Sequence, residues 1–72
     1  MHSRLKGTVK WFHEVNGVGV ITAEDGSGDY FVARCAILMV GRARLLEGER
    51  VSFEPIIDGL AFWAFNVAEL QP

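Results

Sequence analysis

Side chains able to carry out catalysis or bind a metal are few in this sequence and lie far apart. Cys35 is the only cysteine, so no internal disulfide can form, and the only imidazoles belong to His2 and His13. This set offers no plausible group of zinc ligands. Several carboxylates fall at expected turns without a nearby His, Ser or Lys constellation, namely Glu14, Glu24, Asp25 and Asp29. We therefore expect no catalytic residue, no metal and no cofactor, and we do not expect an enzyme.

The charged residues are segregated along the chain. The net charge of −2 argues against a protein that holds nucleic acid mainly through an excess of Lys and Arg. Basic residues nevertheless stand without acids in two segments, at Arg4, Lys6 and Lys10 and again at Arg34, Arg42 and Arg44. Such a chain can present a local basic rim, although each single charge is also explained by an ordinary solvated surface.

The length of 72 residues leaves room for one compact domain, residues 1–72. No apolar run approaches the roughly 20 residues of a membrane span. The first four residues, Met1 to Arg4, also lack the apolar stretch of a signal peptide. Together with the single cysteine, these features predict a cytoplasmic protein that has no contact with a membrane.

Strand and turn signals predict five strands, at residues 6–13, 18–23, 30–33, 51–54 and 60–70. The turns between them are marked by Asn16-Gly17, residues 25–29, residues 47–49 and Asp58-Gly59. Pro55 is expected to end the pairing of the fourth strand. Residues 34–46 are expected to hold one short helical turn within a long connection. Because no helix is long enough to cover a sheet, we expect a small closed barrel, with an SH3-like barrel as the alternative.

Five separated segments resemble the bacterial cold-shock protein family in order and in spacing. They read GTVKWF at 7–12, GVGVI at 17–21, DYFV at 29–32, EG at 47–48 before VSF at 51–53, and NV at 66–67. The similarity covers essentially the whole chain, as in a divergent member of the family. It implies an all-β, five-stranded antiparallel Greek-key barrel of the OB-fold type. It also implies binding of single-stranded RNA and DNA, often as an RNA chaperone or a regulator of transcription or translation.

The family's binding roles can be assigned to the matching positions of this sequence. In such proteins, outward aromatic side chains stack on unpaired bases, and every base offers a π-face for this contact. Trp11 and Phe12 match the stacking residues of the first strand, and Phe31 matches the first aromatic position of the third. Lys10 matches a lysine that contacts phosphate. The resemblance therefore assigns these four residues to the binding face.

Several positions depart from the family pattern. The second-strand motif, usually KGFGF, reads NGVGV at 16–20, so Val18 and Val20 replace two phenylalanines. Arg34 and Arg42 stand where aromatic residues are usual. Valine methyls can still contact a base, and guanidinium planes can stack and reach phosphates. The predicted nucleic-acid-binding residues are therefore Lys10, Trp11, Phe12, Val18, Val20, Phe31, Arg34 and Arg42, with weaker binding than in the family.

The face on which Trp11 lies depends on the regularity of the first strand. Strict alternation puts Trp11 on the same side as Val9, whereas the family places Trp11 outside and Val9 inside. A bulge or curvature near Lys10 would reconcile the two.

The last strand is richer in aromatic residues than the family pattern, which has small residues and a proline there. By alternation Trp63 and Phe65 share one face, while Phe62 and Ala64 share the other. These aromatics form a relocated stacking platform, a hydrophobic patch for a partner, or an enlarged core.

Two functions follow from these observations. The first is single-stranded nucleic-acid binding, RNA first and DNA second, with stacking aromatics and with Lys10 and Arg34 at the phosphates. The alternative is a protein-interaction or self-associating module on a degenerate cold-shock scaffold. It would form a homodimer through an apolar face that includes Val18, Val20 and Phe31 and can extend to Trp63.

Overall fold

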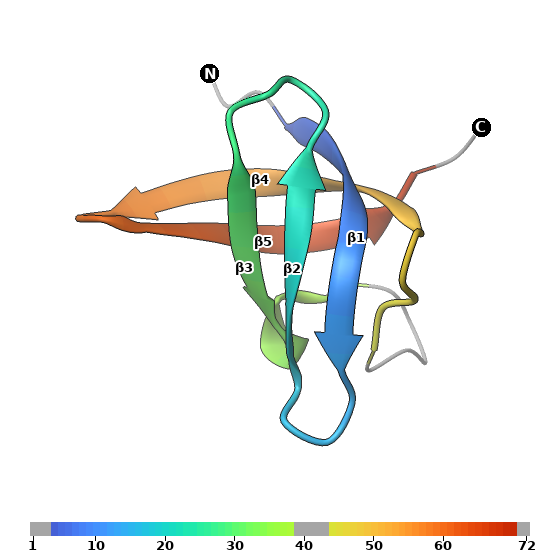
Figure 1. The fold of residues 1–72 in the computed structure, drawn as a ribbon. Helices are drawn as coiled ribbons and strands as arrows, with labels where there is room; N and C mark the ends of the chain where they lie inside the picture. The colour runs from blue at the N-terminus through green and yellow to red at the C-terminus, as the bar shows by residue number, and fades with distance from the viewer. Residues whose placement is uncertain (1–3, 39–43, 71–72) are drawn as a thin grey trace.

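The described part of the chain folds into five strands and one short helical turn (Figure 1). The computed structural model describes residues 4–38 and 44–70. In chain order the elements are β1 (Leu5–His13), β2 (Val18–Ala23), β3 (Asp29–Ala33), the 3₁₀ turn η1 (Arg34–Ala36), β4 (Arg50–Asp58) and β5 (Ala61–Glu69). The five strands and the single helical turn predicted from the sequence are confirmed.

The strands close into a barrel in the order β1-β2-β3-β5-β4. Figure 1 shows β1, β2 and β3 side by side, crossed by the hairpin of β4 and β5. All neighbouring strands are antiparallel except β3 and β5, which are parallel and meet at Phe31 and Trp63. This parallel contact follows from the topology, because β4 lies beside β1 and therefore returns β5 in the direction of β3. The predicted five-stranded OB-fold barrel is confirmed.

The expectation that Pro55 ends the pairing of the fourth strand is wrong. Pro55 pairs with Ala64, and the ladder between β4 and β5 continues to Asp58 opposite Ala61. β1 accompanies β4 only as far as Phe53, so among residues 4–38 and 44–70 the outer edge of β4 has no strand partner beyond Phe53. A proline is tolerated at such an edge, because the side that lacks an N–H donor can face away from the ladder.

The barrel core is formed by side chains from the inner faces of the strands. The largest completely buried ones are Val9, Ile21, Val32, Val51, Phe53 and Val67. Successive residues of a strand point to opposite faces, so Val20 and Thr22 lie on the outer face when Ile21 lies inside. The same strands therefore build the core with one set of side chains and an outer face with the other. Within residues 4–38 and 44–70, no helix has the length and apolar character to cross a membrane.

Candidate nucleic-acid interface

A β-bulge in β1 places Trp11 on the outer face of the sheet. Val9 pairs with Ile21 and the next pair is Trp11 with Val20, so Lys10 is an extra residue in β1. One extra residue shifts the alternation of the side chains. As a result Val9 is buried in the core, whereas Trp11 is half-buried on the opposite face. The bulge near Lys10 that would reconcile the alternation with the family pattern is confirmed.

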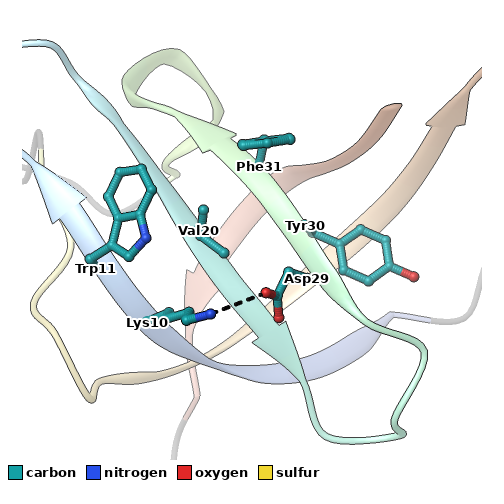
Figure 2. A pocket seen from close by; sticks show the side chains of 6 residues that line it. All are labelled: Lys10, Trp11, Val20, Asp29, Tyr30 and Phe31. Carbon is teal, nitrogen blue, oxygen red and sulfur yellow. Dashed lines mark hydrogen bonds and ion pairs between the residues drawn. The ribbon is translucent and has the colours of Figure 1, made fainter. Parts of the chain in front are cut away.

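Three side chains from neighbouring strands form a row on this face. Trp11 of β1 pairs with Val20 of β2, which in turn pairs with Phe31 of β3. Directly paired side chains share a face, and Figure 2 shows Trp11 and Phe31 on either side of Val20. Val20 is 7% exposed without belonging to the barrel core, and Phe31 is 51% exposed. We refer to Trp11, Val20 and Phe31 as the outer row.

A hollow beside the outer row contains two opposite charges. It is lined by Lys10, Trp11, Val20, Asp29, Tyr30 and Phe31 (Figure 2). Nζ of Lys10 lies 3.4 Å from Oδ2 of Asp29. The hydroxyl of Thr22 donates a hydrogen bond of 2.9 Å to Oδ1 of the same carboxylate. A phosphate that approaches Lys10 must therefore compete with Asp29 for the ammonium group.

Phe12 is not on the face that Trp11 occupies, which corrects the placement expected from the sequence. It pairs with Gly19, which pairs with the fully buried Val32, and its ring packs against the core. A Cβ atom added at Gly19 would lie 2.7 Å from Cδ1 of Phe12 and 2.4 Å from the main-chain oxygen of Trp11. Gly19 therefore makes room for Phe12 behind the sheet. Phe12 therefore packs against the core and is not a member of the outer row.

Two more of the predicted binding residues, Val18 and Arg34, lie towards the turn between β1 and β2. Val18 is 40% exposed and shares the face of Val20. The guanidinium of Arg34 donates a hydrogen bond to the main-chain oxygen of Glu14, and its main-chain N–H donates to the oxygen of Gly17 at 2.8 Å. Arg34 is thus held against the turn, beyond the end of the outer row. Arg42 lies outside the described residues.

The aromatic residues of β5 divide between the two faces as alternation predicts. Phe62 points inward with its ring 5.6 Å from that of Tyr30, and Ala64 is buried. Trp63 lies on the outer side, with its ring centroid 5.8 Å from that of Phe31 and the two planes at 49°. Phe62 therefore enlarges the core, whereas Trp63 continues the outer face.

Asp29 is not among the binding residues predicted from the sequence, and Trp63 was predicted only within the three alternatives for the aromatic residues of the last strand. Asp29 stands two residues before Phe31, and strand alternation alone would have placed both on one face. No pattern in the sequence indicates that Trp63 lies beside Phe31, because the contact between β3 and β5 arises only when the barrel closes.

The fold and this face together define a class of protein. A closed five-stranded barrel in this strand order, with aromatic side chains on the outer face of β1 and β3, is typical of the OB-fold, a class that binds oligonucleotides and oligosaccharides. Among solved structures, drosophila Unr CSD456 has the same fold, with a TM-score of 0.81 and 21% sequence identity. The match covers 99% of this chain and 28% of that one.

The sequence assigns the chain to one family within this class. The family described as the 'Cold-shock' DNA-binding domain matches residues 5–69, and the chain belongs to it. Cold shock-like protein CspE of Escherichia coli K12 is 56% identical over 52 residues, which are 72% of this chain and 75% of that protein. Cold shock-like protein CspC of Shigella flexneri is 51% identical over 57 residues, 79% and 81% of the two chains. Glycine-rich protein 2 of Nicotiana sylvestris is 51% identical over 51 residues, 71% of this chain but 24% of that protein. This membership supports nucleic-acid binding of the cold-shock type.

Proposed function

We propose that this protein binds single-stranded nucleic acid, RNA first and DNA second, by stacking bases on the outer row. The observation that carries the proposal is the pair of aromatic rings, Trp11 and Phe31, on one accessible face on either side of Val20. Bases of unpaired strands are free to stack on such rings, whereas those of a duplex are not. Lys10 lies beside the row, where it can meet a phosphate.

Three features favour binding weaker than that of a full aromatic face. Valine occupies positions 18 and 20, Phe12 is turned to the core, and Asp29 neutralises Lys10. A stacking partner contributes about 1–3 kcal/mol per base, and such terms are rarely additive. Weak, sequence-tolerant contacts dissociate quickly. We therefore infer the role of an RNA chaperone, which must release its strand, in preference to that of a regulator bound stably at one sequence.

A fluorescence titration of a Trp63→Phe variant tests the proposal, because Trp11 is then the only tryptophan. We expect a pyrimidine-rich oligonucleotide to quench the emission of Trp11. The affinity should fall with salt by a log–log slope of about −0.7 for each phosphate contact. An oligonucleotide concentration of about 1 mM detects a binding free energy of only about 4 kcal/mol. If neither quenching nor binding occurs at that concentration and at low salt, the proposal is refuted.

The second candidate function is the protein-interaction or self-associating module. It is favoured by exposed apolar side chains on the hairpin of β4 and β5: Ile56, Ile57, Leu60 and Phe65. In the described part of the chain, no strand pairs with the outer edge of β4 beyond Phe53, and another strand could pair with its main-chain groups. Dimerisation that rises with protein concentration and is unaffected by RNA would support this function. A monomer at high concentration in analytical ultracentrifugation would exclude its self-associating form.

A further inference from the structure

The outer face continues beyond the outer row onto β5 and β4. Phe31 is in register with Trp63, and Trp63 is in register with Ile56 of β4. Ile56 is 44% exposed, and Trp63 is partly exposed. Because neighbouring strands lie about 4.8 Å apart, the three strand steps from Trp11 to Trp63 span about 14 Å. One apolar track with aromatic rings on three strands therefore crosses the barrel from β1 to β5.

The inward neighbours of Trp63 hold its ring on this face. Phe62 contacts Tyr30, and Ala64 is 1% exposed, so both residues that flank Trp63 point towards the core. The indole cannot enter the core without reversing both of them. It meets Phe31 at a tilt of 49° and a centroid distance of 5.8 Å. Tilted rings do not cover each other's faces as parallel stacked rings do, and this leaves aromatic surface for a flat ligand.

We propose that Trp63 is an additional base-stacking position, which extends the single-stranded nucleic-acid site from the outer row onto β5. The inference rests on the proposed function, because it lengthens the same site. The nucleotide bound by Trp63 follows the one stacked on Phe31, so the strand crosses from β3 to β5. The partly exposed ring of Trp63 lies in line with Trp11 and Phe31, which suits the stacking of successive bases. Binding of a protein partner does not require this alignment.

Two single-tryptophan variants locate the bound strand. Trp11→Phe leaves Trp63 as the reporter, and Trp63→Phe leaves Trp11. Both are titrated with oligothymidylates of about four and about eight nucleotides, since OB-folds bind sites of about 4–16 nucleotides. We expect both lengths to quench Trp11, and the longer oligonucleotide to quench Trp63 more strongly.

Removal of the ring tests its contribution to affinity. We expect Trp63→Ala to weaken binding of the longer oligonucleotide about tenfold, as for the loss of one stacked base, and to leave the shorter one nearly unchanged. Trp63→Phe keeps a stacking ring and should retain most of the affinity. Ile57→Ala is the matched control, because Ile57 is an exposed apolar residue of the same hairpin and pairs with Phe62 instead of Trp63.

The failure of this inference and that of the proposed function give different results. If Trp11 is quenched but Trp63 is unaffected by either length, the strand stops at Phe31 and the extension is wrong. The same conclusion holds if Trp63→Ala weakens both lengths equally, because Trp63 then only supports Phe31. If Trp63 emission responds to protein concentration and not to oligonucleotide, the surface binds a second copy. If neither tryptophan responds and no binding occurs, the proposed function itself fails.

Discussion

Val20 is the residue at which the outer row departs most clearly from the aromatic pattern of the family. Its side chain lies between Trp11 and Phe31, yet it is not part of the barrel core. A larger side chain at this position can therefore extend outward without displacing core residues. The position is suited to testing whether stacking on this face limits affinity.

We predict that Val20→Phe tightens binding of a pyrimidine-rich oligonucleotide about tenfold, within the 1–3 kcal/mol that one stacked base contributes. The matched control is Val15→Phe, which adds the same ring at a residue that is 94% exposed in the turn between β1 and β2. Fluorescence titration of both variants measures the effect. Equal affinities for the two variants would contradict the role of the outer row.

The charges beside the row provide a second test at the residue scale. Asp29→Asn removes the carboxylate charge next to Lys10 but keeps an oxygen that can accept the hydrogen bond of Thr22. An exposed ion pair contributes about 0.2–1 kcal/mol, so we expect affinity at low salt to rise up to about fivefold. The log–log salt slope should steepen by up to about 0.7, because Lys10 becomes available to one phosphate.

The control for Asp29→Asn is Glu47→Gln, which changes the net charge equally in the exposed loop before β4. If the two variants bind equally well, the gain comes from net charge alone, and Lys10 does not meet a phosphate.

At the scale of elements, β1 and β2 approach each other closely at Gly19. A Cβ atom at Gly19 would fall 2.4 Å from the main-chain oxygen of Trp11, a contact that main-chain atoms cannot relieve without shifting the strand. The same shift would move the bulge that turns Trp11 outward. Stability and binding are therefore coupled at this position.

We predict that Gly19→Ala lowers the free energy of unfolding by about 1–3 kcal/mol, as overpacking does, and also weakens binding. Urea denaturation measures the first effect. Val18→Ala in the same strand is the control, because Val18 is partly exposed and should change stability by less than about 1 kcal/mol. If Gly19→Ala leaves the free energy of unfolding unchanged, the strands need not approach so closely.

Local sequence patterns predicted the elements better than the contacts between them. The alternation in residues 18–23 separates Val20 from Ile21, and the structure has Ile21 in the core and Val20 on the other face. The aromatic residues of β5 likewise divide between the faces as alternation required. The predicted end of strand pairing at Pro55 was wrong, because the effect of a proline depends on whether a strand lies on its other side. β1 pairs with β4 only as far as Phe53. The proximity of Phe31 and Trp63 joins residues far apart in the sequence, so only the closed barrel reveals it.

At the scale of the whole molecule, a 72-residue barrel has little stability to spare. Phe53 is completely buried, and its ring lies 5.1 Å from that of Tyr30. Folded domains are stable by about 5–15 kcal/mol, and small ones lie near the lower limit. The loss of this one ring therefore affects the entire fold.

We predict that Phe53→Ala costs about 3–5 kcal/mol and leaves a measurable unfolded population without denaturant. Phe65→Ala is the control, since Phe65 is 38% exposed on β5 and should cost clearly less, about 1 kcal/mol. Thermal melting followed by circular dichroism distinguishes the two. Equal melting temperatures would contradict the central place of Phe53 in the core.

The burial of Val20 outside the core has an evolutionary consequence. Two sets of side chains share the same backbone while contributing to separate free energies, one of folding and one of ligand binding. Mutations at the outward set can accumulate under relaxed selection without exposing the chain to misfolding or proteolysis. A lineage can therefore lower its affinity for nucleic acid in small steps and later restore it, while the barrel itself persists unchanged.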